Sequence, residues 1–229
     1  MSAPDWDKDR LYGRRQNKPL RARPAQLMDE VLPRIAVSPE TVSSILQNHD
    51  GPAWLEVGFG GGEHLAWHAA RNPDTLIIGA EPFVNGVAKL VRTVHEENLE
   101  NVRICHGDVR PLMTHMPDGA LSRIFVLHPD PWPKVRHRKR RMISPAFLKE
   151  AARLLVTGGE LRVSSDIPEY IRWTLMMMQL HNRERRDFAW TARSARDWTL
   201  RPDDWPQTRY EAKALREGRQ AAYLSFKRL

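Results

Sequence analysis

The sequence predicts an α/β protein with a doubly wound, mostly parallel, seven-stranded sheet. Three observations support this fold class. Short apolar runs of four to six residues alternate with segments in which the apolar residues have helical spacing. The runs end in Gly, Pro or Asp, as buried parallel strands do. A chain of 229 residues is also long enough for one large domain that buries about 70% of its unfolded surface.

The first 25 residues are predicted to form a flexible basic arm, and residues 26–229 a single domain. Few large apolar residues occur in this arm, so it has little to contribute to a core. Its positive charges include Arg10, Arg14, Arg15, Lys18, Arg21 and Arg23. Helices are expected at Gln26–Ile35 and Pro39–Gln47, the second capped by Ser38 with Pro39 at its first position.

The central part of the chain repeats a strand–helix pattern. The expected strands are Ala53–Val57, Leu76–Ala80, Val102–Cys105, Ser122–Leu127 and Glu160–Ser164. The expected helices are Glu63–Arg71, Val84–Glu97 and Ser144–Val156. The last of these helices begins at Ser144-Pro145 and is expected to stop at Thr157-Gly158-Gly159. This repetition predicts helices on both faces of a parallel sheet.

The last third extends the same architecture. Ile167–Leu180 is predicted to be a further crossover helix whose methionines fill the core. Asp187–Ala192 and Ala221–Phe226 are predicted as the two final strands, the last of them antiparallel. The segment between them, Arg193–Glu217, is polar and rich in Trp, and it is too long for an idle connection in a compact domain.

Composition restricts the class of protein. The single cysteine, Cys105, excludes an intramolecular disulfide and thiolate metal clusters, which favours a reducing, cytoplasmic location. No apolar run approaches 18 residues and no signal peptide is evident, so no membrane association is expected. The net charge of +8 indicates a polyanionic partner, although codon bias in a GC-rich genome would also enrich arginine.

A glycine-rich turn follows the first predicted strand. Gly58, Gly60 and Gly62 would let the backbone approach a ligand at the carboxyl edge of the sheet. A dinucleotide-binding turn would require glycine at position 63, but this chain has Glu63 at the helix N-terminus, where a phosphate would sit. Glu56 adds a further negative charge. The turn therefore favours a ligand without phosphate.

Acidic residues end three successive strands. Glu81 follows Gly62 by 19 residues, the place from which an acid binds ribose hydroxyls, and Asp108 ends the third strand. Together with Glu56 they outline a pocket for a ligand with an adenosine and a positive charge, which S-adenosylmethionine fits. Any one of these acids could instead cap a helix. They lack the His or Cys spacing of a metal site, so no metal is expected.

The fourth strand leads into an aspartate held between two prolines, Pro129-Asp130-Pro131. The prolines fix the backbone, so the Asp130 carboxylate is expected to be held rigidly beside the methyl donor. Trp132 follows Pro131, and its ring could either stack on a base of the RNA or pack into the protein. Six positive charges then fall within eight residues without an acid, and this pattern indicates a nucleic-acid backbone. They are Lys134, Arg136, Arg138, Lys139, Arg140 and Arg141.

These motifs resemble the tRNA (guanine-N7)-methyltransferases, which make 7-methylguanosine at position 46 in the variable loop of tRNA. The resemblance is carried by the segments 56–63, 129–134 with its basic continuation, 165–166 and 208–211, and it runs from Tyr12 to the last strand. It implies a Rossmann-like class I methyltransferase fold. Glu81-Pro82-Phe83 departs from the family pattern, which more often has polar or aliphatic residues after the acid.

The resemblance also implies roles for individual residues. The S-adenosylmethionine contacts would be Glu56, Glu81, Asp108 and Asp130, and the tRNA or guanine contacts Lys134, Asp166, Thr208, Arg209, Tyr210 and Glu211. Guanine N7 carries no proton, so the reaction needs close, in-line positioning rather than a general base. Asp130 is the expected catalytic residue. The expected partner is tRNA, with the protein a monomer or homodimer.

Two alternatives remain at this point. The first is methylation of an exocyclic amine, in which an acidic or amide residue precedes Pro-Pro-aromatic at the same strand end; here Asp130 lies between prolines instead. The second is an RNA-binding module with a vestigial cofactor pocket, which the four intact acids oppose.

Overall fold

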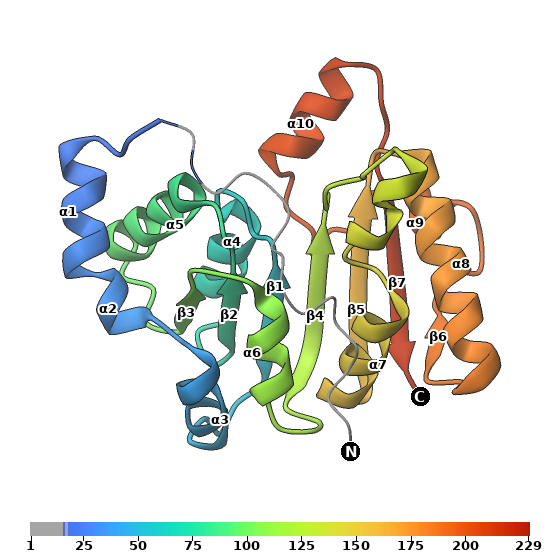
Figure 1. Cartoon of the computed structure of the whole chain (residues 1–229), viewed down its shortest axis with the longest axis horizontal. Coiled ribbons are helices and arrows are strands. Elements are labelled where there is room, and N and C mark those ends of the chain that lie inside the picture. Colours follow the sequence, from blue (N-terminus) through green and yellow to red (C-terminus); the bar gives the residue numbers. More distant parts are fainter. Residues whose placement is uncertain (1–15, 17) are drawn as a thin grey trace.

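The computed structural model describes residue 16 and residues 18–229. Within these residues seven strands form one sheet in the order β3-β2-β1-β4-β5-β7-β6 (Figure 1). Strands β1 to β5 pair in parallel, whereas β7 runs antiparallel to both of its neighbours. The strands are β1 Ala53–Val57, β2 Leu76–Ala80, β3 Val102–Cys105, β4 Leu121–Leu127, β5 Leu155–Ser165, β6 Phe188–Trp190 and β7 Ala222–Arg228.

Helices connect these strands. The first five are α1 Ala22–Glu30, α2 Leu32–Ile35, α3 Pro39–Gln47, α4 Glu63–Arg71 and α5 Val84–Glu96. They are followed by α6 Val109–His115, the 3₁₀ helix η1 Val135–Arg140, α7 Pro145–Leu154, α8 Pro168–Glu184, α9 Arg196–Thr199 and α10 Arg209–Arg216. No helix among the described residues combines the length and the apolar content needed to cross a membrane.

The sheet separates two hydrophobic cores, because side chains alternate between its faces. In β1, Leu55 belongs to the core that also contains residues of α3, α6, α7 and α8. Its neighbour Trp54 belongs to the other core, with residues of α1, α4 and α5. All five residues of β1 are buried, which explains why this strand is apolar throughout except for Glu56.

The order of the strands places the ligand-binding crevice. From β1 the chain continues to β2 and β3 on one side, and then returns to add β4 on the other side of β1. In doubly wound sheets ligands bind at such a reversal, beyond the carboxyl ends of the strands. In Figure 1, α10 lies beyond the arrowheads of this part of the sheet.

The predicted fold class is confirmed. The bounds of α3, α4, β1, β2 and β3 agree with the sequence prediction. The first helix was expected at Gln26, whereas α1 begins at Ala22 and buries Leu27. Residues 1–15 and residue 17 of the predicted basic arm lie outside the described residues, so the division between arm and domain stays a prediction.

Other element bounds differ from the prediction. Thr157-Gly158-Gly159 was expected to stop a helix, but α7 ends at Leu154 and these residues lie within β5. There the pairing with β4 shifts register between Leu121 and Arg123, an irregularity that the two glycines accommodate. Helix α6 was not predicted.

Candidate active site

A cavity of about 470 Å³ lies at the carboxyl edge of the sheet, where the reversal in strand order predicts a ligand site. This volume is typical of small-molecule sites, which have about 300–1,000 Å³. Its acidic lining residues are Glu56, Glu63, Glu81, Asp108 and Asp130. Arg140 is the one Lys or Arg among the described residues that line it. The cavity is therefore suited to a ligand that is neutral or cationic.

The glycine turn and Glu81 hold each other in place. Gly58 and Gly60 have φ angles of 68° and 59°, which glycine adopts without strain. The Gly60 N–H donates to Glu81 Oε2, and the Phe83 N–H donates to Glu81 Oε1, both at 2.8 Å. Burial raises the pKa of Glu81, an effect that these two hydrogen bonds oppose. Helix α5 also packs closely, since a Cβ on Gly86 would lie 2.0 Å from the Gly60 carbonyl oxygen.

Glu56 and Asp108 reach the same cavity with different partners. Glu56 is buried, and its Oε2 accepts a hydrogen bond from His64 Nδ1 at 2.7 Å. Asp108 caps α6 by accepting from the Arg110 N–H at 3.0 Å, and Arg110 Nε also donates to it. The capping alternative therefore holds for Asp108, although this residue also lines the cavity.

Asp130 differs from the other acids of the cavity. Among the described residues it makes no hydrogen bond or ion pair, and burial is the one cause of its shifted pKa. The residue is solvent-exposed, but the walls of the cavity displace enough of the surrounding water to raise its pKa. The flanking residues His128 and Trp132 have positive φ angles of 46° and 40°. Such strain in non-glycine residues is common at functional sites.

Arg141 fixes the loop that carries Asp130. Its Nε donates to the Pro131 carbonyl oxygen at 2.8 Å, and its Nη2 forms an ion pair with Glu169 at 3.0 Å. The guanidinium also lies over the Trp173 ring at 4.9 Å. Arg141 was predicted to bind RNA, and the structure corrects this prediction. Its side chain is only 1% exposed and cannot reach a phosphate.

The rest of the predicted RNA-binding run forms η1 and the residue before it. Lys134, Arg136 and Lys139 are exposed. Arg138 forms an ion pair with Glu169 at 2.9 Å, and the Arg140 guanidinium lies 4.9 Å from the centre of the Trp132 ring. Since Trp132 and Arg140 both line the cavity, the basic surface and the cavity are continuous.

Asp166 lies beside the cavity, at the end of β5. It accepts from Arg219 Nε at 2.7 Å and from His128 Nδ1 at 3.2 Å. Burial opposes ionisation of this carboxyl, but the two hydrogen bonds outweigh it and lower the pKa of Asp166. His128 lines the cavity, whereas Asp166 does not. Asp166 is thus linked to the cavity through His128.

The late segment, residues 193–217, reaches the cavity through α10 and the residue before it. Thr208 caps α10, accepting from the Glu211 N–H at 3.3 Å, and it lines the cavity with Tyr210. A Cβ on Gly60 would lie 2.9 Å from the Tyr210 ring, so the two segments touch. Arg209 lies against the glycine turn, 3.5 Å from Glu63.

Glu211 requires a second correction. It was predicted to contact tRNA, but it is buried and hydrogen-bonded to the Tyr223 hydroxyl of β7. It also lies 3.6 Å from Arg201. Glu211 therefore anchors α10 to the sheet and does not face a ligand.

Several residues of this region were not predicted from the sequence. His64 and His68 are spaced four residues apart on α4, directly after the glycine turn, and this spacing was a usable signal. Nothing in the sequence indicated a role for Arg219, because it lies far along the chain from Asp166 and many other arginines surround it in the sequence. Asp204 and Trp205 fix the late segment: Asp204 contacts Arg162 at 2.8 Å, and Trp205 is buried against Tyr223.

Comparisons with known proteins identify the family. A model of a family described as putative methyltransferase matches residues 50–224. A tRNA (guanine-N(7)-)-methyltransferase of Rhodospirillum rubrum is 48% identical over 227 residues, which cover 96% of this chain and 88% of the relative. One of Chelativorans sp. is 43% identical and covers 99% of this chain and 98% of the relative. The chain belongs to the tRNA (guanine-N7)-methyltransferase family.

Solved structures support the fold of this methyltransferase. The 16S rRNA methyltransferase KamB superposes with a TM-score of 0.57 at 16% identity, covering 81% of this chain and 91% of that one. A putative methyltransferase from Streptococcus mutans in complex with SAH superposes with a TM-score of 0.52 at 9% identity, covering 92% of this chain and all of that one. At these identities the likeness concerns the fold alone.

The lining of the cavity fits the methyl donor of this family, S-adenosylmethionine. This molecule carries a sulfonium and an ammonium group and no phosphate, which matches a cavity rich in carboxylates. Gly58 adds space, because a Cβ at this position would meet no atom within 4 Å. The N-terminus of α4 carries Glu63, which would repel a phosphate.

Proposed function

We propose that this protein transfers the methyl group of S-adenosylmethionine to N7 of guanosine 46 in the variable loop of tRNA. The observation that carries the proposal is the position of Asp130. This carboxylate, which has no partner in the described part of the chain, lies between an acid-lined cavity and a basic surface. Asp130 thus lies between acidic residues suited to a cationic nucleoside and basic residues suited to an RNA backbone.

The acids of the cavity would hold the methyl donor. Glu81 ends β2, where acids of doubly wound sheets bind ribose hydroxyls. Glu56 places negative charge near the glycine turn, where it would stabilise a cationic group. Asp108 lines the cavity from the end of β3. When bound, S-adenosylmethionine supplies an electrophilic methyl group, and positive charge passes from sulfur to guanine during transfer.

The residues around Asp130 would position the guanine. N7 has a lone pair and no proton, so the protein has no proton to remove before the N–C bond forms. Asp130 can accept hydrogen bonds from the N1–H and N2–H groups of guanine, and its negative charge stabilises the cation that develops on the purine. Arg141 and the two prolines hold Asp130 rigidly, which keeps the approach in line.

The exposed cations would bind tRNA. Lys134, Arg136 and Lys139 face solvent beside the cavity, as phosphate-binding residues must. Trp132 lies at the cavity with Arg140 over its ring, so it can stack on a base withdrawn from the RNA. Thr208 and Tyr210 contribute from the other side. Whether the protein acts as a monomer or a homodimer stays a prediction.

Incubation with labelled S-adenosylmethionine and unmodified tRNA tests this function. We expect one methyl group per tRNA and chain cleavage at position 46 after treatment specific for 7-methylguanosine. The matched control is the same tRNA with adenosine at position 46, which should take up no label. Label in an exocyclic amine would support the alternative activity. Binding of tRNA without binding of S-adenosylhomocysteine would support an RNA-binding module instead.

A further inference from the structure

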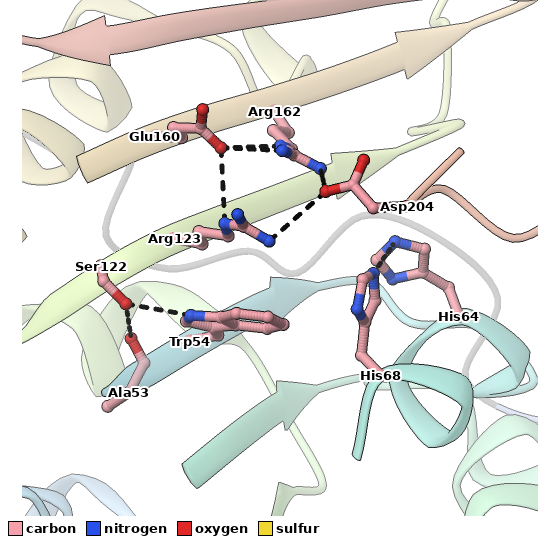
Figure 2. A network of polar contacts seen from close by, with 9 residues as sticks. All are labelled: Ala53, Trp54, His64, His68, Ser122, Arg123, Glu160, Arg162 and Asp204. Carbon is pink, nitrogen blue, oxygen red and sulfur yellow. Dashed lines mark hydrogen bonds and ion pairs between the residues drawn. The ribbon is translucent and has the colours of Figure 1, made fainter. Parts of the chain in front are cut away.

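Two buried histidines lie at the cavity: His64 is one of its lining residues, and His68 contacts His64 without lining the cavity. His64, the second residue of α4, is 2% exposed. Its Nδ1 lies 2.7 Å from Glu56 Oε2, and its Nε2 lies 3.2 Å from His68 Nε2. Figure 2 shows the two imidazole rings joined by this contact, in which they meet edge to face. His64 therefore connects a carboxylate of the cavity to a second buried ring.

His68 is held by packing on three sides. Its ring stacks on Phe125 with centroids 5.4 Å apart, and it meets the rings of Trp54 and Trp67 edge-on at 5.2 and 4.9 Å. Burial lowers the pKa of His68 to about 3, with a smaller contribution from His64. His68 is thus a neutral, immobile hydrogen-bond partner under ordinary conditions.

The charged groups around His68 belong to a network on β4, β5 and the late segment. Arg123 and Arg162 each approach Glu160 and Asp204, at distances between 2.8 and 3.6 Å (Figure 2). Arg123 also lies 4.6 Å over the Trp54 ring, whose Nε1 donates to Ser122 at 2.9 Å. The positive and negative charges in this network are balanced in number, and together they fix the aromatic wall against which His68 packs.

The hydrogen-bond roles follow from the chemistry of the partners. An ionised carboxylate can only accept, so His64 Nδ1 donates to Glu56. The second nitrogen of His64 then meets His68. Two converging imidazole nitrogens could also indicate a metal site, but no group of three His, Cys, Asp or Glu side chains in the described part of the chain is arranged to hold a metal ion. A direct hydrogen bond between the rings accounts for their contact.

We propose that His64 is a positioning residue for methyl transfer: it fixes the Glu56 carboxylate in the cofactor cavity, and His68 fixes His64. This inference rests on the proposed function, because it assigns the cavity to S-adenosylmethionine. With Oε2 bound to His64, the other oxygen of Glu56 remains available to a cationic group of the ligand. The arrangement is the one that orients ligands in other sites, in which a buried partner sets the direction of the group that makes contact.

Two conservative variants separate the contacts of His64. The amide nitrogen of His64→Asn falls near the position of Nδ1 and can still donate to Glu56, whereas that of His64→Gln falls near Nε2 and can reach only His68. We expect His64→Gln to weaken S-adenosylhomocysteine binding by roughly tenfold or more, as loss of a hydrogen bond to a charged group does. We expect His64→Asn to stay within about threefold of the wild type.

Calorimetric titration of S-adenosylhomocysteine measures both effects, and initial rates give the KM for each substrate. The KM for S-adenosylmethionine should rise in His64→Gln while the KM for tRNA stays unchanged. His95→Asn, an exposed histidine on α5, is the control and should match the wild type.

The outcomes are distinct. Equal losses in the Asn and Gln variants would mean that His64 only fills the core, and a change confined to the KM for tRNA would also contradict the proposal. Normal affinity in both variants would remove His64 from the site. Failure of the wild type to bind S-adenosylhomocysteine would instead contradict the proposed function, before any variant is compared.

Discussion

Arg141 donates a hydrogen bond from Nε to the carbonyl oxygen of Pro131, ten residues earlier in the chain, at 2.8 Å. Through this contact Arg141, although it belongs to a run of basic residues, supports the neighbouring loop that carries Asp130. The loop consists of prolines around Asp130 and has few amide donors of its own, so its geometry depends on contacts from outside. Arg141, Glu169 and Trp173 supply them.

Arg141→Lys should therefore lower both stability and activity. Lysine keeps the charge but cannot bind Glu169 and the Pro131 carbonyl in the same planar geometry. We expect the free energy of unfolding to fall by about 2 kcal/mol, as for a lost buried hydrogen-bond network. The matched control is Arg138→Lys, since Arg138 pairs with the same Glu169 from an exposed position. Equal denaturation midpoints for the two variants would contradict the structural role of Arg141.

Asp130→Ala and Asp130→Asn should lose activity without losing stability. Removing a group that stabilises developing charge costs about 100-fold or more in kcat. Because the pKa of Asp130 is raised in the folded protein, its ionised form opposes folding above that pKa. Both variants should therefore melt at the wild-type temperature or slightly higher at pH 7. Single-turnover methylation and thermal melting measure the two effects, with the exposed Asp29→Asn as control. A folded Asp130→Ala with normal turnover would remove Asp130 from the catalytic role.

Arg219→Gln should destabilise the protein in a pH-dependent way. The pKa of Asp166 is lowered in the folded state, so its ionised form stabilises the fold at neutral pH, and this contribution is lost as pH falls through the lowered pKa. Since Arg219 is partly exposed, we expect a small loss of stability at pH 7 that narrows below about pH 4. Urea denaturation at several pH values measures it. A difference that is independent of pH would mean that Arg219 acts through packing alone.

Removal of metal ions should leave the protein unaffected. Apart from Glu63 at the start of α4, the acids of the cavity are single residues at strand ends, and they have hydrogen-bonding partners or face the ligand space. We expect titrations of S-adenosylhomocysteine with and without a chelator to give the same affinity. Activity that vanished with chelator and returned with zinc or magnesium, while the tRNA stayed folded, would overturn this expectation.

The central strands could be predicted from the sequence because they are buried on both faces. A strand such as β1 must then be apolar throughout, and its ends are marked by residues such as Gly58 that a strand disfavours. Helix α6 escaped prediction because it has only seven residues and contains Pro111. Its capping residue, Asp108, was interpreted as a ligand-binding acid; in the structure it caps α6 and also lines the cavity.

Site residues could be predicted from the sequence where they lie at the end of a strand. They could be predicted less well where contacts between distant residues determine which way the side chain turns. Glu56, Glu81 and Asp130 could be predicted to meet at one cavity because parallel strands bring their carboxyl ends together at one edge. The assignments of Arg141 and Glu211 were wrong because their partners, Glu169 and Tyr223, lie 28 and 12 residues away. Nothing in the local sequence distinguishes Arg141, which turns inward, from Lys139, which faces solvent.

This distinction sharpens the expectation for tRNA binding. If Arg136 and Lys139 contact phosphates, each contact releases counterions, so the affinity should fall steeply with salt on a log–log plot. Arg136→Ala combined with Lys139→Ala should flatten the slope by roughly one to two units and leave the affinity for S-adenosylhomocysteine unchanged. Arg138 and Arg141 should contribute less, since Glu169 already compensates part of their charge.

A charge-matched control separates phosphate contacts from net charge. Arg183 and Lys227 are exposed and lie toward the ends of α8 and β7 that point away from the cavity. The variant with both changed to alanine loses the same two charges, but it should keep the wild-type slope, because screened charges far from the RNA release few counterions. Titrations of tRNA at several salt concentrations decide the matter. If the salt slope flattens equally in both double variants, only the overall charge of the protein acts. If all three proteins have the same slope, the RNA site does not lie at η1 and must be sought in the segment 193–217 or the N-terminal arm.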